Sequence, residues 1–429
     1  MCGQLTTLQI THLYLYTMQK LFFTLAVLFT TSVCLSAQDT FFTEKEVKKH
    51  VAYLASDKLK GRGTGTKEEL KAAKYIAKQF KKAGLSPKGT ANTWLHTFTF
   101  RKSSDPHGMS HDGPTVSSNN VVGYLDNGSP YTVVIGAHYD HLGLGHDHNS
   151  LDANPEGKIH NGADDNASGT AAVIELARYY AQNGVKEQHN FLFICFSGEE
   201  LGLLGSKKFT ETPTIDLSSV SYMINMDMIG RLNEEKRLVI GGVGTSPAFV
   251  PLINNLKTDI GIKKDSAGIG PSDHTSFYLK NIPVLFAFTG QHSDYHKPSD
   301  DTEKVNFTGE VKILQLMTQI INELDRVPKL VFQETKTKDA GGTPAFKVTL
   351  GIMPDYTFEE KGVKVDGVTD NRPAAKAGLV KGDIIIGLGS IEVNDMASYM
   401  KALAAHKKGD KTKVKVKRGS DTKEFDVEF

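Results

Sequence analysis

The feature that most constrains the fold of this chain is a series of short apolar runs separated by helical patterns, between residues 131 and 327. Apolar runs of this length, rich in β-branched and aromatic residues, are typical of strands buried on both faces. Strands are expected at 131–136, 190–197, 221–226 and 282–288, and helices at 169–183 and 309–327. This alternation predicts an α/β fold with a mixed, mostly parallel central sheet flanked by helices. Reactive side chains then belong on the loops that leave the strand ends.

Two more helices are expected before this sheet. Thr43 precedes a helical pattern and has Glu46 at the capping-box spacing, and a second pattern at 68–85 ends at a glycine. The stretch 102–118 is rich in Ser, His, Asp and Gly, and therefore predicts a surface loop.

The composition changes after Pro328, which marks the predicted end of the first domain. Beyond it the chain becomes richer in Lys, Val and Gly, and the expected strands are short. One amphipathic helix, at about 396–406, interrupts them. The sequence therefore predicts two domains, at 38–328 and 335–429, of which the second is small and mainly antiparallel β.

The first 37 residues predict an export signal. From Met18, which is a candidate start, a short basic region precedes an apolar core and a small-residue exit at Ala37. A single membrane anchor is the alternative, but the apolar run is shorter than the ~20 residues that span a bilayer. We therefore expect a periplasmic or secreted protein with no membrane span in the mature chain.

The charge of the chain argues against nucleic acid as a partner. Lys and Arg number 50 and Asp and Glu 49, so the net charge is +1 and no basic field is expected over the molecule. Hydrophobic residues at 39% and charged residues at 23% are typical of a globular protein rather than a disordered or multi-spanning one.

Acidic and imidazole side chains gather at the predicted strand ends. His138 follows the strand at 131–136, and Asp140 stands two residues further on. A neutral imidazole is a good zinc ligand, and a carboxylate at this spacing can accept its other N–H and orient the ring. Asp164 and Asp165 are adjacent at the start of a helix, where two ionised carboxylates need a compensating positive charge. Capping of that helix is the structural alternative.

Three further motifs continue this pattern. Glu199 and Glu200 follow the next predicted strand, and one of them can bind a metal while its neighbour shuttles a proton for water. Asp227 ends an apolar strand, where an isolated charge is costly unless it is paired or bound to a metal. His296 supplies a second imidazole, and Tyr295 beside it supplies a phenol.

Together the motifs provide two histidines and three carboxylates as ligands, one spare glutamate and one orienting aspartate. This set exceeds the three protein ligands of a single open catalytic zinc. It suits two zinc ions about 3.5–4 Å apart that share a bridging carboxylate. The sequence therefore predicts a binuclear metal hydrolase with two Zn²⁺ per chain.

The series HYDHLG, NGADDNASG, SGEELGLLGS, NMDMIGR and DYHKPSD, in this order, resembles the co-catalytic zinc aminopeptidase family. Relatives of that family include glutamate carboxypeptidase and the glutaminyl cyclases. The resemblance runs from about residue 43 to residue 327. It implies the zinc-peptidase fold and peptides as substrates.

The resemblance also implies a role for each motif residue. The implied ligands are His138 and Asp227 for one zinc, Glu200 and His296 for the other, and Asp164 as the bridge between them. The bridging aspartate would have a cis bond to Asp165. Glu199 would be the general base and acid, and Asp140 would orient His138. Tyr295 matches a tyrosine that stabilises the tetrahedral oxyanion in some members.

Three further residues are candidates for the substrate pocket, of which Asp273 and His274 would lie either in the pocket or directly behind it. Asp273 and His274 lie in the stretch GPSDHTSF, which resembles one near the substrate in exported members of the family. Helix capping is the alternative for both. Arg231 could bind a substrate carbonyl or terminal carboxylate, and a structural salt bridge is its alternative.

The second domain resembles a PDZ module of the bacterial type. The stretch DNRPAAKAGLVKGD carries the more specific part of the match. Leu350, Gly351 and Ile352 match the loop that offers backbone N–H groups to a peptide's terminal carboxylate. The helix at 396–406 would form the other wall of a groove to which the peptide adds as a strand. A peptide C-terminus is thus an implied partner, and a module that binds nothing is the alternative.

The sequence favours an exported two-zinc aminopeptidase with a C-terminal PDZ domain. A metallocarboxypeptidase is the alternative among enzymes, and it differs in whether basic or acidic residues face the substrate terminus. A glutaminyl cyclase fits less well, because that branch works with one zinc and this chain retains the full set of ligands. From another class, the chain could be an inactive scaffold that displays its PDZ domain, but such a scaffold is expected to have lost a ligand or Glu199.

Overall fold

The structure is a computed structural model that describes residues 41–102, 113–147, 149–335, 348–354, 358, 360–368, 372–394 and 396–429. The predicted export signal at 1–37, with its candidate start at Met18, lies outside the described residues. Within the described part of the chain, no helix has both the length and the apolar character that a membrane crossing requires.

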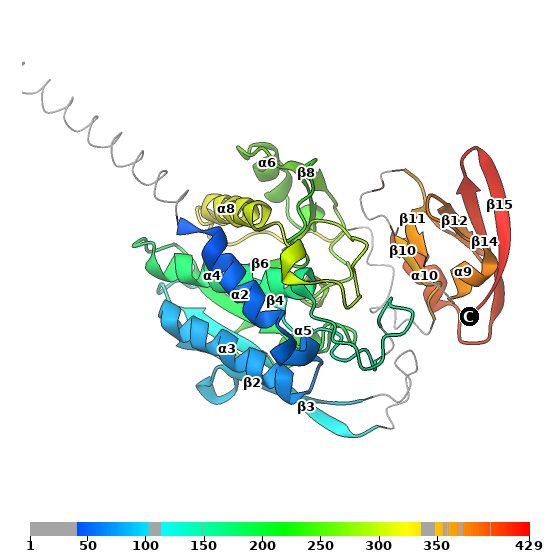
Figure 1. The fold of residues 1–429 in the computed structure, drawn as a ribbon. Coiled ribbons are helices and arrows are strands. Elements are labelled where there is room, and N and C mark those ends of the chain that lie inside the picture. Colours follow the sequence, from blue (N-terminus) through cyan, green and yellow to red (C-terminus); the bar gives the residue numbers. More distant parts are fainter. Residues whose placement is uncertain are drawn as a thin grey trace, which may run out of the picture. The chain divides into compact units, whose positions relative to one another are not determined.

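A mixed sheet forms the centre of the N-terminal part (Figure 1). In chain order, its strands are β1 (Ser86–Pro87), β2 (Leu95–Arg101), β3 (Thr115–Leu125), β4 (Thr132–His138), β5 (Asn190–Phe196), β6 (Val220–Met226), β7 (Arg237–Gly241), β8 (Gly261–Lys264) and β9 (Val284–Phe288). They lie in the order β1-β3-β5-β4-β6-β9-β7-β8, with β2 beside β3. The central strands β5, β4, β6 and β9 run parallel, whereas β3 and β7 join them antiparallel. The predicted fold class is confirmed.

Helices cover both faces of this sheet. They are α2 (Glu44–Leu54), α3 (Lys67–Ala83), α4 (Gly169–Gln182), α5 (Leu204–Glu211), α6 (Phe249–Asn254), α7 (His274–Tyr278) and α8 (Phe307–Leu324). Alternate residues of a strand point to opposite faces. In β5, Phe191 stacks on Tyr180 of α4 with ring centroids 4.4 Å apart, whereas Phe196 lies in a buried cluster with Phe209 of α5 and Phe277 of α7.

The α3 helix shows how local sequence sets an element's ends. Thr66 accepts a hydrogen bond from the backbone N–H of Glu69, which caps the start of the helix. Gly84, with φ of 103°, ends it in the left-handed conformation that glycine adopts without strain. These signals were visible in the sequence, and the predicted helix at 68–85 is confirmed apart from its last two residues.

Two segments differ from the sequence prediction. Residues 115–118, expected in a surface loop, form the start of β3 because they pair with β2 in register Arg101↔Thr115. The chain also stays with the first sheet beyond Pro328, since Phe332 packs on Tyr278 with ring centroids 5.5 Å apart. We therefore propose a domain boundary after Thr335, seven residues later than the predicted one.

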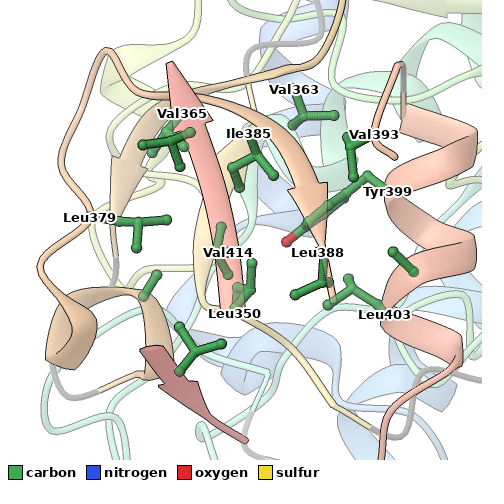
Figure 2. Close-up of a cluster of buried hydrophobic side chains, with 14 of the residues drawn as sticks. Leu350, Val363, Val365, Leu379, Ile385, Leu388, Val393, Tyr399, Leu403 and Val414 are labelled. Atoms are coloured by element: carbon green, nitrogen blue, oxygen red, sulfur yellow. The ribbon is translucent and has the colours of Figure 1, made fainter. Parts of the chain in front are cut away.

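The C-terminal part is a small antiparallel sheet with two short helices. It contains β10 (Ile352–Pro354), β11 (Val363–Val368), α9 (Pro373–Ala377), β12 (Ile384–Leu388), β13 (Ile391–Glu392), α10 (Met396–Ala404), β14 (Lys411–Arg418) and β15 (Asp421–Glu428). Its core joins strand residues such as Val365 and Leu388 to Tyr399 and Leu403 of α10 (Figure 2). The predicted antiparallel architecture and its amphipathic helix are confirmed.

The predicted peptide loop lies at the start of β10. Leu350 is fully buried in the core of this part, and its carbonyl accepts from the backbone N–H of Ala374 at 2.8 Å. Gly351 has φ of 73°, and its N–H donates to Oγ1 of Thr349 at 3.0 Å. Ile352 begins the pairing of β10 with β11. A peptide carboxylate that used the Gly351 N–H would therefore displace Thr349.

Candidate metal centre

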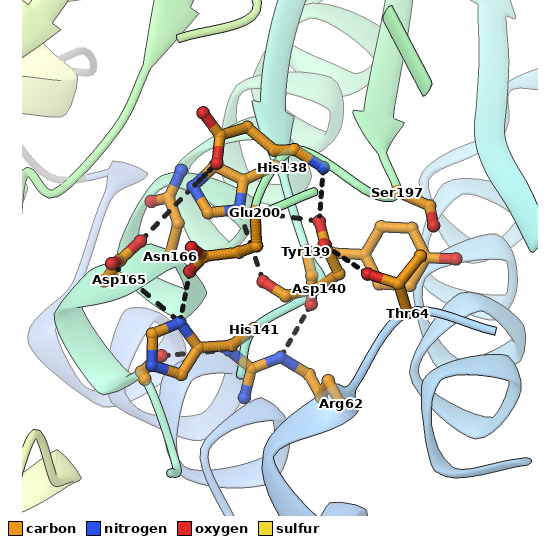
Figure 3. A network of polar contacts seen from close by, with 12 residues as sticks. Arg62, Thr64, His138, Tyr139, Asp140, His141, Asp165, Asn166, Ser197 and Glu200 are labelled. Atoms are coloured by element: carbon orange, nitrogen blue, oxygen red, sulfur yellow. Dashed lines mark hydrogen bonds and ion pairs between the residues drawn. The ribbon is translucent and has the colours of Figure 1, made fainter. Parts of the chain in front are cut away.

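The predicted ligand motifs meet at one edge of the central sheet. Because β5, β4 and β6 are parallel neighbours, their carboxyl ends lie side by side. The side chains that gather there are His138, which ends β4, Glu199 and Glu200 after β5, Asp227 after β6, Asp165 from the turn before α4, and His296 from the loop after β9. Figure 3 shows part of this cluster.

Their donor atoms have the spacing of ligands on two ions. Ligand atoms about 2.0–2.1 Å from a tetrahedral zinc lie about 3.3 Å from one another. Nε2 of His138 is 3.2 Å from Oδ1 of Asp227 and 3.3 Å from Oδ1 of Asp165. Nε2 of His296 is 3.1 Å from Oε2 of Glu200 and 3.2 Å from Oδ2 of Asp165. Asp165 thus turns one oxygen to each histidine, as a bridging carboxylate does, and the donor set fits two zinc ions.

The structure contradicts the prediction that Asp164 is the bridge. Oδ1 of Asp164 accepts from the backbone N–H of Gly230 at 2.6 Å, and its Oδ2 lies 3.2 Å from Nε2 of His292. Consecutive side chains project in different directions, so Asp164 turns away when Asp165 enters the centre. The cis peptide bond also lies one residue later than predicted, between Asp165 and Asn166.

Backbone carbonyls orient the two predicted histidine ligands. Nδ1 of His138 lies 3.2 Å from the carbonyl O of Asp140, and Nδ1 of His296 lies 2.8 Å from the carbonyl O of Asn149. Nδ1–H is therefore the donor in each ring, and the lone pair of Nε2 remains for a metal.

Asp140 supports the centre in a different way from the one predicted. Its nearest carboxylate oxygen is 3.7 Å from Nδ1 of His138, so its contact with the ring is through the main chain. The carboxylate instead accepts from Oγ1 of Thr64 at 2.7 Å and from the backbone N–H of Glu199 at 3.2 Å. Asp140 therefore joins the loop after β4 to the loop that carries Glu199.

The carboxylates of the centre differ in proton affinity. Burial opposes ionisation of Asp165, but hydrogen bonds with His138 and His296 outweigh it and bring its pKa well below the ordinary value. Burial also opposes ionisation of Glu200, yet the charge of His296 lowers its pKa to about 2. For Glu199, burial raises the pKa well above its usual range, and His138 opposes this only in part. Burial also raises the pKa of Asp227, so Glu199 and Asp227 are the two carboxylates of the centre with the stronger tendency to take a proton.

Tyr295 and Arg231 lie beside the centre. The ring of Tyr295 stacks on His296 with centroids 3.9 Å apart and touches a buried apolar cluster that includes Met228. Nη2 of Arg231 lies 3.2 Å from Oδ2 of Asp294 and 3.2 Å from Oδ1 of Asp300. The geometry of Arg231 is therefore that of the structural salt bridge given as its alternative.

Asp273 and His274 are buried beneath the centre rather than exposed on a pocket wall. Their exposed fractions are 0% and 1%. His274 stacks on Phe286 with ring centroids 4.5 Å apart, and burial lowers its pKa to about 3. Burial raises the pKa of Asp273 to about 7. This burial favours supporting positions behind the pocket wall for both side chains, which is one of the two positions expected for them.

Sequence reasoning missed three residues of this region. His141, in the HYDH motif, lies 2.7 Å from Glu200 and was not assigned a role. His292 contacts Asp164, and no sequence pattern indicated that contact. Glu69 is buried and hydrogen-bonds Ser197, in the SGEE motif. Its position three residues after Thr66 is a capping-box signal that the sequence did contain.

Comparison with known proteins agrees with the division into two parts. The model of peptidase family M28 matches residues 120–321, and that of the PDZ domain matches residues 344–429. Leupeptin-inactivating enzyme 1 of Streptomyces exfoliatus is 25% identical over 251 residues, which are 53% of this chain and 56% of that protein. A probable leucine aminopeptidase of Arthroderma otae is 26% identical over 224 residues, which are 49% of this chain and 58% of that protein. The chain thus spans little more than half the length of these relatives.

Solved structures share the fold. An aminopeptidase from Aneurinibacillus sp. strain AM-1 has a TM-score of 0.51 at 19% identity, covering 70% of this chain and 98% of that one. The glutaminyl cyclase of Porphyromonas gingivalis has a TM-score of 0.51 at 15% identity, covering 66% of this chain and 99% of that one. The motifs and the matched models thus identify residues 120–321 as a region of peptidase family M28 and residues 344–429 as a PDZ domain.

Proposed function

We propose that this chain is an exported aminopeptidase that uses two zinc ions and Glu199 as its general base. The observation that carries the proposal is the placement of Asp165, whose two oxygens lie 3.3 and 3.2 Å from Nε2 of His138 and of His296. Asp227 and Glu200 complete the two halves. The aminopeptidase names of several relatives support the same reaction class.

The chain's own residues supply the proton transfers. Two bound zinc ions would make water more acidic and polarise the carbonyl of the scissile bond. Glu199 takes a proton from the attacking water and passes that proton to the departing amine. The breakdown of the tetrahedral species then yields a free amino acid and a shortened peptide. Tyr295, which stacks on His296, would donate its O–H to the developing oxyanion.

The alternatives differ in what would recognise the substrate's end. A carboxypeptidase needs a cation for a terminal carboxylate, and Arg231 is already paired with Asp294 and Asp300. A glutaminyl cyclase shares the fold, but the full set of ligands in this chain favours hydrolysis. An inactive scaffold is disfavoured because Glu199 and the ligand side chains converge.

The proposal extends to the PDZ domain and to export. The domain would take the C-terminus of a peptide in a groove that β10 and α10 would form, as PDZ modules do. The segment 1–37 would direct export, and N-terminal sequencing of the protein recovered outside the cytoplasm would locate the cleavage site. Recovery of a chain that still begins before residue 37 would argue against cleavage.

The central test compares the full chain with its Glu199→Gln variant after zinc is restored. We expect release of p-nitroaniline from aminoacyl-p-nitroanilides by the wild type, and a rate lower by about 10²–10⁴-fold in the variant, because the proton carrier is lost. Zinc content, measured by elemental analysis, should be equal in both proteins.

Each alternative predicts a different result in the same assay. Equal rates would remove Glu199 from the mechanism. Hydrolysis restricted to N-blocked peptides would favour a carboxypeptidase, and pyroglutamyl products from N-terminal glutamine would favour a cyclase. Absence of any turnover with two zinc ions bound would favour a scaffold.

A further inference from the structure

A third histidine, His141, lies inside the centre although it is not among the predicted ligands. Its side chain has an exposed fraction of 0%. Its Nδ1 lies 2.7 Å from Oε1 of Glu200, whereas Oε2 of Glu200 lies 3.1 Å from Nε2 of His296 (Figure 3 shows the first contact). The two oxygens of Glu200 are thus divided between two histidines.

The distances between donor atoms show which pairs could bind the same metal ion and which pair is hydrogen-bonded. Pairs that would share an ion in this centre lie 3.1–3.3 Å apart, close to the ~3.3 Å expected on a tetrahedral zinc. The 2.7 Å between His141 and Glu200 is instead a short hydrogen bond. Oδ2 of Asp165, at 3.8 Å from Nδ1 of His141, is too distant for one.

The other ring nitrogen of His141, Nε2, also indicates that Nδ1 makes a hydrogen bond rather than a bond to a metal. A histidine that binds a metal almost always donates its other N–H to an acceptor. His138 and His296 do so, to the carbonyls of Asp140 and Asn149. Among the described residues, Nε2 of His141 has no hydrogen-bond partner. The tautomer that avoids a buried, unpaired N–H carries its proton on Nδ1, which therefore donates to Glu200.

The surrounding backbone holds the His141 ring in this place. A Cβ on Gly162 would lie 2.5 Å from Cγ of His141, so glycine is needed where the chain passes the ring. The backbone N–H of His141 donates to the carbonyl of Arg62 at 3.3 Å. On the other side, the ring meets His296 edge-on, with centroids 5.9 Å apart and an interplanar angle of 73°.

We propose that His141 is a positioning residue of the metal centre, which holds Oε1 of Glu200 so that Oε2 alone faces the metal position beside His296. The proposal rests on the two-zinc function proposed above. By fixing one rotamer of Glu200, the hydrogen bond lowers the entropy that zinc binding must remove, and it keeps Oε1 from competing for the ion. Zinc affinity in the half formed by Asp165, Glu200 and His296 then depends on His141.

The test measures zinc binding to the full chain by competition with a chromophoric chelator, which needs no substrate. His141→Ala should weaken one of the two binding events by about 10–100-fold, as removal of a ligand's hydrogen-bond partner typically does, and leave the other unchanged. His141→Asn should restore most of the loss, because its side-chain N–H₂ stands near the position of Nδ1. His146→Ala, in the same loop but exposed, is the matched control and should bind like the wild type.

The outcomes distinguish this inference from the function on which it rests. A wild type that binds no zinc would overturn the proposed function itself. Two unchanged binding events in His141→Ala would overturn the inference alone. Equal losses of zinc affinity in His141→Asn and His141→Ala would show that the ring nitrogen binds the metal directly. An equal loss in His146→Ala would show that the effect comes from the loop as a whole. Either result would overturn the positioning role.

Discussion

At the scale of single residues, Asp164 and Asp165 show how strongly function depends on side-chain direction. The two carboxylates are neighbours in the chain, and both are buried. Asp165 contacts two histidines of the centre, whereas Asp164 accepts the backbone N–H of Gly230 at 2.6 Å. Asp165 is therefore the proposed ligand, whereas Asp164 holds the loop after β6 against the turn before α4.

The pair offers a matched comparison. Asp165→Asn should lower zinc affinity by more than about 100-fold, because it replaces an anionic ligand with a neutral amide. Loss of a ligand should weaken binding more than loss of a residue that only hydrogen-bonds a ligand, which costs about 10–100-fold. Asp164→Asn keeps an acceptor for Gly230 and should retain two zinc ions. Elemental analysis of both variants after dialysis checks this expectation. Loss of zinc in Asp164→Asn with retention in Asp165→Asn would restore the role that the sequence suggested for Asp164.

Glu69 gives a prediction on stability and pH. Burial raises its pKa to about 8, with Asp140 adding to the shift, although Gly65, Ser118 and Ser197 donate hydrogen bonds to it. A carboxyl with a raised pKa favours folding while it is neutral, and this stabilisation is lost as pH rises from about 4.5 to about 8. A glutamine side chain does not ionise, so the stability of Glu69→Gln should not fall for this reason as pH rises.

The wild type should therefore lose more stability than Glu69→Gln between pH 5 and pH 8. Thermal unfolding of both proteins at each pH, with chelator present, gives the difference in Tm between them. The titration of groups that both proteins share contributes equally to both Tm values and drops out of this difference. A difference in Tm that stays constant across this interval would contradict the raised pKa.

At the scale of elements, Arg62 ties three segments of the site together. Nε donates to the carbonyl of Tyr139 at 2.7 Å, Nη1 to those of Leu54 and Asn161 at 2.6 Å each, and Nη2 to that of Gly162 at 3.0 Å. The end of α2, the loop after β4 and the loop before α4 thus share one guanidinium (Figure 3 shows its bond to the loop after β4). A planar fork of donors suits this geometry better than an ammonium.

Arg62→Lys should therefore destabilise the protein by about 2–4 kcal/mol, because buried carbonyls lose their donors. Urea unfolding monitored by fluorescence measures the change. Lys58→Ala, at an exposed position of the neighbouring turn, is the control and should stay within about 0.5 kcal/mol of the wild type. If Arg62→Lys changed the free energy of unfolding by less than about 0.5 kcal/mol, the loops would keep their positions without the guanidinium group.

At the scale of the whole molecule, two separate cores follow one another along the chain. The core of the C-terminal part draws its residues from Val348 onward, and the cluster on the first sheet draws its residues from before that position. The predicted metal ligands all belong to the first part. Zinc should therefore stabilise one part of the chain and not the other.

Calorimetry of the full chain should show two unfolding transitions. Zinc at about a thousand times its Kd should stabilise only one of them, by about 4 kcal/mol for each ion bound. Leu388→Ala, in the core of the C-terminal part, should lower only the other, by about 2–5 kcal/mol. A single transition that responds to both changes would show that the two parts unfold as one unit.

The sequence by itself determined the sheet, the helices that flank it and the chemical types gathered at its edge. Apolar periodicity, caps and turns are local signals, and parallel strands bring their carboxyl ends together whatever the details of the loops. The motif at residues 199–200, for instance, had to meet His138 once β4 and β5 were neighbours. The antiparallel C-terminal part was visible for the same reason.

The tertiary structure alone decided which neighbour of a pair enters the centre and how each partner is oriented. The choice of Asp165 over Asp164, the main-chain contact of Asp140 with His138, and the hydrogen bond from His141 depend on turn geometry and on loops that are distant in the chain. Spacing along a sequence reports which donors are present. Direction in space depends on packing between elements, which no single segment encodes.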